Sequence, residues 1–144
     1  MVGFQNTLSP LLETTVNIYQ IVRFILQKLY ATHKEGFTID PHAIDLYVAT
    51  DDDAYIVSLE GCEMRSHTQP GKWQLLHWLG EHIKELSKSN HYVGMWRDGI
   101  EDWVYDVSIE IIGREMAIKF AQANHQEAIW DVDKQECVPV PAAE

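Results

Sequence analysis

The side chains that could bind a metal ion are seven histidines, two cysteines and a run of three aspartates. His77 and His82 lie five residues apart in a helical pattern, which corresponds to about 500° of rotation. They therefore miss the i, i+4 spacing that places two zinc ligands on one helix face. Cys62 and His67 have a ligand-like spacing, but no second Cys/His pair lies near them in the sequence. We expect no metal site.

The acidic residues do not form a recognisable calcium-binding or catalytic pattern. Asp51-Asp52-Asp53 lacks the alternating order and the distal Glu of a calcium loop and is typical of a solvated turn. Asp106 and Glu110 are expected on one strand face, about 13–14 Å apart, which is too far for a glycosidase pair. The sequence also lacks the local signatures of serine or cysteine nucleophiles and of nucleotide-binding glycine loops. We therefore assign no catalytic residue and no cofactor, and the sequence favours a non-enzymatic protein without deciding the question.

The sequence is strongly acidic. It has 22 Asp and Glu against 11 Lys and Arg, a formal net charge of −11. Such a charge opposes binding to phosphate backbones, so we expect no nucleic-acid partner. The charge is uneven, because residues 1–36 carry two acids and three bases whereas residues 91–144 carry eleven acids and four bases. The candidate acidic surface consists of Asp98, Glu101, Asp102, Asp106 and Glu110.

Length and hydropathy indicate one domain over residues 1–144. No apolar stretch approaches the roughly 18 residues that a bilayer span needs, and the N-terminus lacks the pattern of a signal peptide. Cys62 and Cys137 lie 75 residues apart without secretory context, which favours free thiols. We expect a cytoplasmic protein with no membrane partner.

The N-terminal part, residues 1–36, is predicted to form one long helix. Ser9-Pro10 is a typical helix start and Gly36 a typical residue after a helix end, which predicts a helix over about 10–34. Its apolar residues cover far more than one side. The helix is therefore either a central helix covered by the sheet or a helix that binds a partner. The candidate interaction residues are Ile18, Ile21, Val22, Phe24 and Ile25.

Residues 37–140 are predicted to form the α+β core, followed by a loose tail at 141–144. Residues 37–50 fit a strand or a short helix. The clearest pattern is at 101–112, where Trp103 to Ile111 alternate with Val104, Asp106, Ser108 and Glu110, as expected for one buried and one wetter strand face. The other expected elements are strands at 54–59, 91–96, 128–132 and 136–140 and helices at 73–86 and 114–124. The strands at 91–96 and 101–112 should form a hairpin.

This order predicts an α+β fold with an antiparallel sheet of about four to six strands and about three helices, one of them long and N-terminal. Residues 91–132 resemble a segment that recurs in small uncharacterised bacterial and phage proteins. The resemblance rests on Tyr92-Val93-Gly94, Trp96 and Asp98, on Tyr105-Asp106-Val107-Ser108, and on the run from Asn124 to Asp131. It implies a hairpin, helix and strand unit and a setting on a mobile element.

The sequence as a whole favours a non-enzymatic protein-interaction domain. We expect it to self-associate through the N-terminal helix as a homodimer or other homo-oligomer, or to bind another protein there. The alternative is an acidic inhibitor, encoded by a phage or another mobile element, that blocks a basic site on a host protein. A second alternative is a small enzyme with an unrecognised motif. An exposed apolar stripe, a broad acidic face and a polar cleft would favour these three functions respectively.

Overall fold

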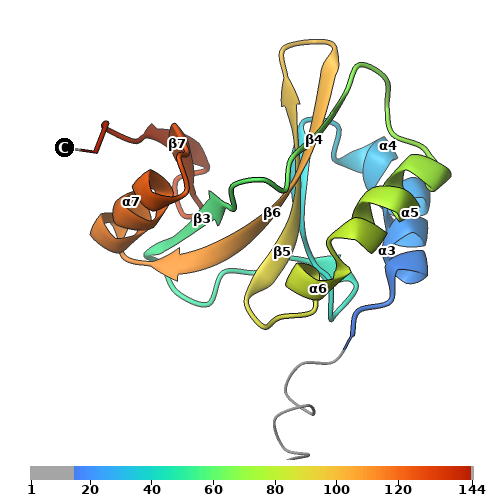
Figure 1. Ribbon diagram of the computed structural model, residues 1–144, viewed down its shortest axis with the longest axis horizontal. Helices are drawn as coiled ribbons and strands as arrows, with labels where there is room; N and C mark the ends of the chain where they lie inside the picture. Colours follow the sequence, from blue (N-terminus) through green and yellow to red (C-terminus); the bar gives the residue numbers. More distant parts are fainter. Residues whose placement is uncertain (1–14, 144) are drawn as a thin grey trace, which may run out of the picture.

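The computed structural model describes residues 15–143 and contains one antiparallel sheet of eight strands with helices packed against it (Figure 1). Seven strands follow the order β2-β1-β5-β6-β3-β7-β8, and β4 pairs with β6. The predicted α+β class is confirmed, but the sheet has more strands than expected. The additional strands are β2 (Asp45–Leu46) and β4 (Met64–Ser66), which are too short for a period-two pattern to reveal in the sequence.

The N-terminal helical segment runs through α3 (Ile18–Phe24), the π-helix η1 (Ile25–Leu29) and α4 (Tyr30–Thr32). It begins where Oδ1 of Asn17 accepts a hydrogen bond from the backbone N–H of Gln20 at 3.1 Å. Of the helix predicted over 10–34, residues 15–17 are not helical and residues 10–14 lie outside the described range. The side-chain cap at Asn17 gives the local reason for this start.

Residues 37–50 form a strand, a turn and a second strand. β1 (Gly36–Asp40) pairs with β2, with Ile39 opposite Leu46. At the turn, Oδ1 of Asp40 accepts a hydrogen bond from the backbone N–H of His42 at 3.0 Å. This short local bond is typical of an Asx turn, which offers the backbone an alternative to a helix. The question that the sequence left open is thus answered in favour of strands.

The predicted central hairpin is confirmed and consists of β5 (His91–Asp98) and β6 (Asp102–Ile112). Its register places Gly94 opposite Asp106 and Asp98 opposite Asp102. β3 (Ala54–Ser58) and β4 both pair with the other edge of β6. Since β6 is the fourth of the seven strands in the sheet order, it is the central strand of the sheet.

The helices form two groups, which Figure 1 shows at opposite sides of the view. The first group is the N-terminal segment with α5 (Lys72–Glu81) and α6 (Ile83–Leu86), and the second is α7 (Arg114–Ala123). Tyr105 lies in the core beneath the first group and Ile111 packs on the core beneath the second. These two residues are an even number of positions apart on β6, so both groups lie on the same sheet face.

The opposite face of β6 differs from the prediction. Val104, Asp106, Ser108 and Glu110 were expected on a wetter face, but all four are buried. Side chains from neighbouring segments cover them: Trp96 donates a hydrogen bond to Asp106, and Tyr47 donates one to Glu110. An alternating pattern identifies which residues share a face, but it does not reveal that loop and strand side chains fold over the polar side.

The C-terminal strands β7 (Ala128–Asp131) and β8 (Glu136–Pro139) extend the sheet beyond β3. Pro139 is the last residue of β8, which lies at the end of the strand order, so its missing N–H interrupts no ladder. This placement confirms the predicted edge strand. Within residues 15–143, no helix combines the length and the hydropathy needed to cross a bilayer.

Candidate functional site

A groove of about 250 Å³ lies on the outer side of the helical layer, between α3, η1 and α5. Its lining residues are Tyr19, Val22, Arg23, Leu26, Gln27, Lys72 and Leu76. Tyr19 is 68% exposed, and Trp73, next to Lys72 on α5, is 75% exposed. The Lys72 ammonium lies 5.0 Å from the centre of the Trp73 ring. We call this surface the α3–α5 groove.

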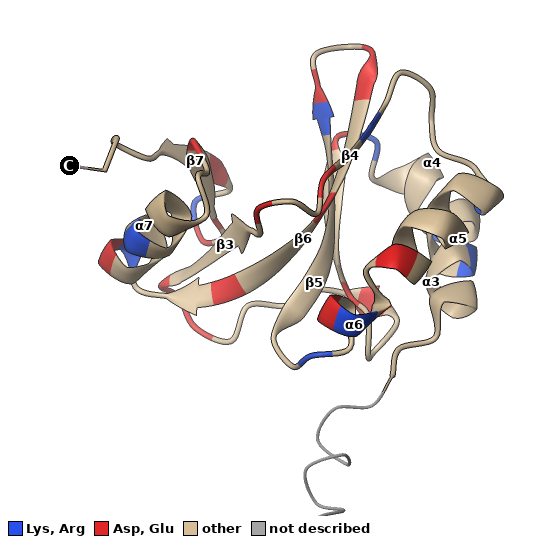
Figure 2. Ribbon diagram, in the orientation of Figure 1, with Lys and Arg blue, Asp and Glu red and all other residues tan. Residues whose placement is uncertain are grey.

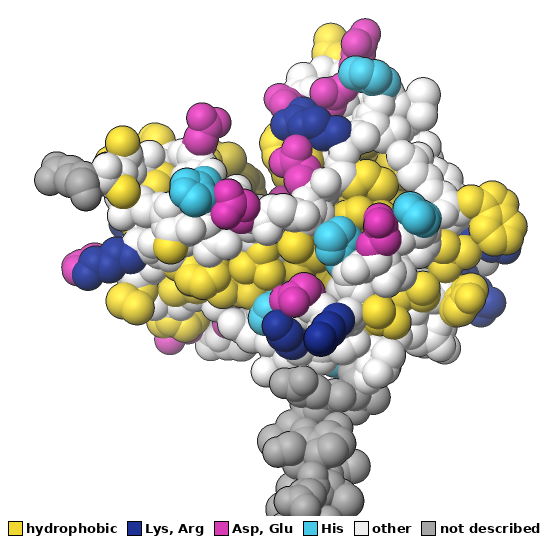
Figure 3. Space-filling view, in the orientation of Figure 1, with side chains coloured by type: hydrophobic (Ala, Val, Ile, Leu, Met, Phe, Trp, Pro, Cys, Tyr) yellow, Lys and Arg dark blue, Asp and Glu magenta, His cyan; other side chains and the backbone are white. Residues whose placement is uncertain are grey.

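The α3–α5 groove has the opposite charge to the rest of the protein. Its lining contains Arg23 and Lys72 and no acidic residue. Residues 15–34 carry three bases and no acid, although the whole chain has twice as many acids as bases. Figure 3 shows hydrophobic and basic side chains together at this side of the molecule. The groove is therefore an apolar surface with a cationic rim, which favours an apolar ligand that carries negative charge.

The structure places the predicted interaction residues in or against the core. Ile21, Val22 and Ile25 are buried in the core of the chain itself, because α5 and the sheet pack against that side of the helix. Ile18 and Phe24 are partly buried against the same core. The apolar residues of the α3–α5 groove that are exposed to a partner are instead Tyr19 and Leu26. The interpretation of this segment as a central helix thus fits all five predicted residues. The exposed apolar surface is formed by two other side chains, Tyr19 and Leu26.

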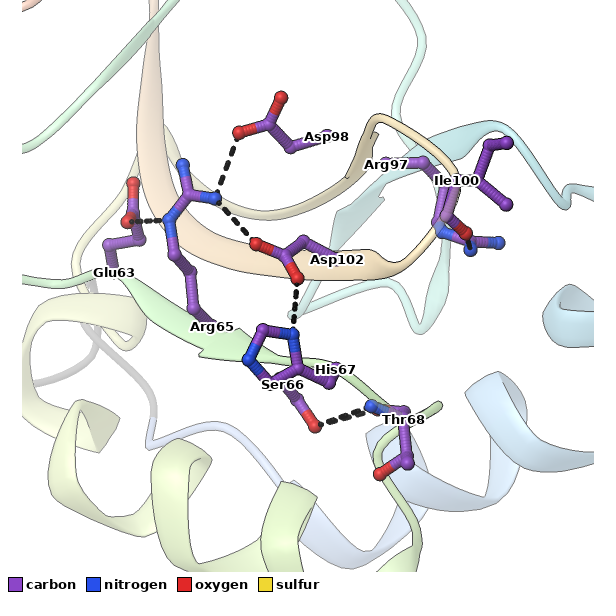
Figure 4. Close-up of polar contacts among 9 residues, drawn as sticks. All are labelled: Glu63, Arg65, Ser66, His67, Thr68, Arg97, Asp98, Ile100 and Asp102. Carbon is purple, nitrogen blue, oxygen red and sulfur yellow. Dashed lines mark hydrogen bonds and ion pairs between the residues drawn. The ribbon is translucent and has the colours of Figure 1, made fainter.

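The predicted acidic residues Asp98 and Asp102 lie at the turn end of the β5–β6 hairpin, where both contact Arg65 of β4 (Figure 4). The Arg65 guanidinium lies 2.9 Å from a carboxylate oxygen of Asp98, 3.2 Å from Asp102 and 2.9 Å from Glu63. Hydrogen bonds to Asp98 and Glu63 raise the pKa of Arg65. Nδ1 of His67 lies 2.7 Å from the second oxygen of Asp102. These contacts tie β4 to the hairpin.

The hairpin tip, residues 98–102, presents an apolar side chain among acids. Ile100 is 89% exposed, and Gly99 next to it has a φ of 71°, which glycine adopts without strain. The Arg97 guanidinium donates a hydrogen bond to the Ile100 carbonyl oxygen and lies 4.1 Å from the centre of the Trp103 ring. Glu101 is exposed and makes no ion pair within residues 15–143. Figure 2 shows the acidic residues of this hairpin end.

Asp106 is not a surface residue, contrary to the prediction. Its Oδ2 accepts hydrogen bonds from Ser58 Oγ at 2.7 Å and from Trp96 Nε1 at 3.3 Å. Burial raises the pKa of Asp106 from 3.8 to about 6, and the two hydrogen bonds oppose this shift. Beside it, Ser108 Oγ is buried and has no hydrogen-bond partner among the described residues. Asp106 is therefore a buried carboxyl group that cannot contact a partner in this fold.

Glu110, also predicted on the acidic surface, fixes the loop before β3. Its carboxylate accepts hydrogen bonds from the Tyr47 hydroxyl, from Thr50 Oγ1 at 2.7 Å and from the Thr50 backbone N–H at 3.2 Å. Burial, and next the bond to Glu110, raise the pKa of Tyr47. The Tyr47 ring also packs edge-on against Tyr92, with centroids 4.9 Å apart. The carboxylate thus has a structural role.

Chemically reactive groups do not converge in the part of the chain that the structure describes. Over residues 15–143, no three His, Cys, Asp or Glu side chains are arranged to hold a metal ion. Cys62 is a free thiol, but burial raises its pKa, which disfavours the nucleophilic thiolate. Cys137 is free and exposed on the edge strand β8.

Two exposed apolar residues were missed by sequence reasoning, although each left a signal. Trp73 lies outside the apolar stripe of its helix. That stripe consists of Leu75, Leu76 and Leu79, of which Leu75 and Leu79 are buried. Ile100 occupies a hairpin turn, where polar residues and glycine are the usual choices. An aromatic residue off the core stripe and an aliphatic residue in a tight turn both indicate exposed apolar surface.

Comparison of the chain with protein-family models, with curated proteins and with solved structures gave no match. The functional argument is therefore carried by the α3–α5 groove and the hairpin tip.

Proposed function

We propose that this protein is a non-enzymatic protein-interaction domain that self-associates, with the α3–α5 groove as its docking surface. The observation that carries the proposal is the exposed apolar surface formed by Tyr19, Leu26 and Trp73 around this groove. Surfaces of this kind lose unfavourable contact with water when a partner covers them. The N-terminal segment contributes to the interface through its outward side, while its inward side supports the core.

The residue types in and beside the groove support a binding role. Tyr, Trp and Arg are the residues most enriched among those that dominate binding energy at protein interfaces, and here they are Tyr19, Trp73 and Arg23. The Lys72 and Trp73 side chains form a cation–π contact. Because this contact already restricts both side chains, they lose less conformational entropy when a partner binds. The domain acts in the cytoplasm, where the free thiols of Cys62 and Cys137 stay reduced.

The test is the mass in solution, measured by light scattering on a sizing column at about 100 µM, where even a weak homodimer is populated. Wild type should give at least twice the 16.6 kDa chain mass. Leu26→Glu should shift the protein toward one chain, because it places a carboxylate in the apolar groove. Met116→Glu is the matched control, because Met116 is 60% exposed on the distant helix α7. A monomeric wild type, or equal behaviour of the two variants, would reject the groove as an interface.

A second candidate function is the acidic inhibitor of a basic site on a host protein, with the hairpin end as the contact surface. The hairpin end carries four carboxylates, those of Glu63, Asp98, Glu101 and Asp102, against two guanidinium groups, and three of the carboxylates pair with Arg65. The resemblance expected from the sequence, of residues 91–132 to small uncharacterised bacterial and phage proteins, is in keeping with this setting. Partner binding should then weaken steeply as salt rises from low to physiological strength. Binding that does not respond to salt would exclude charge as its main driving force.

A further inference from the structure

We infer that the occupant of the α3–α5 groove is the hairpin tip of a second copy of this chain. This inference rests on the proposed function and adds to it the identity of the partner surface. The contact is head-to-tail: the tip of one copy enters the groove of another, so that two different surfaces of the same protein meet. The two surfaces complement each other in hydropathy and in charge, and the hairpin tip is held rigid before it binds.

The first argument is hydropathy. Ile100 is the most exposed of the large apolar side chains in the described chain, at 89%. An aliphatic side chain at a tight turn gains contacts only if another surface covers it. The α3–α5 groove offers such a surface, because Val22, Leu26 and Leu76 line it. A single branched side chain is also small enough for a groove of about 250 Å³.

The second argument is charge. The groove contributes two bases, Arg23 and Lys72, and no acid. Around the tip, the hairpin end has four carboxylates and the two guanidinium groups of Arg65 and Arg97, which gives a net charge of −2. Glu101 adjoins Ile100 and has no ion-pair partner within the described residues, so its charge is available to a cationic rim. The positive charge on the groove rim therefore complements the negative charge around Ile100.

The third argument is rigidity. The β5–β6 ladder continues to the pair Asp98 and Asp102, so the turn between them contains only Gly99, Ile100 and Glu101. Arg97 fixes the turn through its bond to the Ile100 carbonyl oxygen, and Arg65 joins both ends of the turn through its ion pairs (Figure 4). A turn already held in one conformation loses little entropy when it binds.

The experiment uses two variants that alter exposed side chains. The tip variant is Ile100→Ser with Glu101→Lys, and the groove variant is Arg23→Glu with Lys72→Glu. Each should weaken self-association of the full chain by about tenfold to a hundredfold, measured by analytical ultracentrifugation. Val48→Ser is the matched control for the tip, because Val48 is 80% exposed on another loop and its substitution also removes an exposed β-branched side chain. The control should associate as the wild type does.

Mixing the two variants gives the decisive measurement. The unaltered tip of the groove variant can enter the unaltered groove of the tip variant. An equimolar mixture should therefore form a complex that neither variant forms alone. Wild-type association should also weaken as salt is raised, since the rims carry opposite charges.

The outcomes separate this inference from the proposed function. If the groove variant fails to associate but the tip variant associates like wild type, the groove is an interface and the hairpin tip is not its occupant, which overturns the inference alone. If both variants associate like wild type, or if wild type is a monomer at about 100 µM, the proposed function fails as well. Circular dichroism melts of both variants should match wild type, because all four substituted side chains are exposed or lie on the groove rim.

Discussion

The indole Nε1 of Trp96 donates a hydrogen bond at 3.3 Å to Oδ2 of Asp106, a buried carboxyl group on the adjacent strand. The same oxygen accepts a bond from Ser58 Oγ at 2.7 Å, so three strands meet at one carboxyl group. On the outer side of the indole, the Arg65 guanidinium lies 5.7 Å from the ring centre. Trp96 therefore connects the buried Asp106 to the ion pairs of the hairpin end.

Asp106→Asn should change how stability depends on pH. Burial raises the pKa of Asp106 from 3.8 to about 6, so the folded chain binds this proton more tightly than the unfolded chain. The group therefore stabilises the fold fully below about pH 4, and this contribution is lost as the pH rises through about 6. Between about pH 5 and about pH 7, the wild type should lose about 1 kcal/mol more unfolding free energy than Asp106→Asn.

Urea melts of wild type and Asp106→Asn at both pH values measure this difference. Other titrating groups, including the seven histidines, are present in both proteins and cancel in the comparison. Parallel pH profiles for the two proteins would contradict the assignment of a raised pKa to Asp106.

Gly94→Ala should destabilise the fold, because Gly94 gives the Asp106 carboxylate room. A Cβ at position 94 would lie 2.6 Å from Asp106 Oδ1, closer than van der Waals contact allows. We expect a loss of about 1–3 kcal/mol in denaturant melts, as for other overpacked sites. Combining Gly94→Ala with Asp106→Ala should recover part of this loss, since the clashing oxygen is removed. If the effects of Gly94→Ala and Asp106→Ala on the unfolding free energy were strictly additive, the contact between the added Cβ and Asp106 Oδ1 would not be the cause of the destabilisation.

Gly80→Ala is the control for that experiment. Gly80 lies within α5, where the nearest atom to an added Cβ is Ile18 Cδ1 at 3.9 Å, an ordinary contact. Alanine should stabilise this position by about 0.5–1 kcal/mol, the difference in helix propensity. The two substitutions, identical in chemistry, should therefore shift stability in opposite directions.

Tyr47→Phe should destabilise the protein although the aromatic ring is kept. The substitution removes the hydroxyl that donates to the buried Glu110 carboxylate and leaves Thr50 as its remaining side-chain donor. Leaving a buried charged acceptor with fewer donors costs about 1–3 kcal/mol. Tyr19→Phe should have an effect near zero on chemical unfolding, because Tyr19 is exposed in the α3–α5 groove. An equal loss for both substitutions would show that the bond to Glu110 contributes nothing.

Charged substitutions on the two faces of β6 should both be severe. Val107→Asp places a carboxylate in the core beneath α3 and α5, and Ser108→Asp places one on the buried opposite face beside Asp106. Each should cost about 2–5 kcal/mol, because a buried charge without a partner is strongly unfavourable. Ser108→Ala should be nearly neutral, since Ser108 Oγ has no hydrogen-bond partner in the described chain. A mild effect of Ser108→Asp would mean that the opposite face opens to water.

The sequence by itself determined the local features of this protein. Period-two alternation located β6, and the turn residues between 97 and 101 located the hairpin, because both are properties of neighbours along the chain. The apolar spacing at 75–86 predicted the helical region of α5 and α6, and Pro139 marked the edge strand. Composition alone fixed the net charge of −11 and the distinct basic character of the N-terminal part.

The tertiary structure alone decided which side of each element meets water. Asp106 and Glu110 look like surface acids in the sequence, and they are buried because Trp96 and Tyr47, distant by ten and 63 residues, fold over them. Ile21 and Ile25 became core and Tyr19 remained exposed because α5 packs on one particular side of α3. Burial depends on contacts between segments far apart in the chain, and periodicity carries no information about which segments those are.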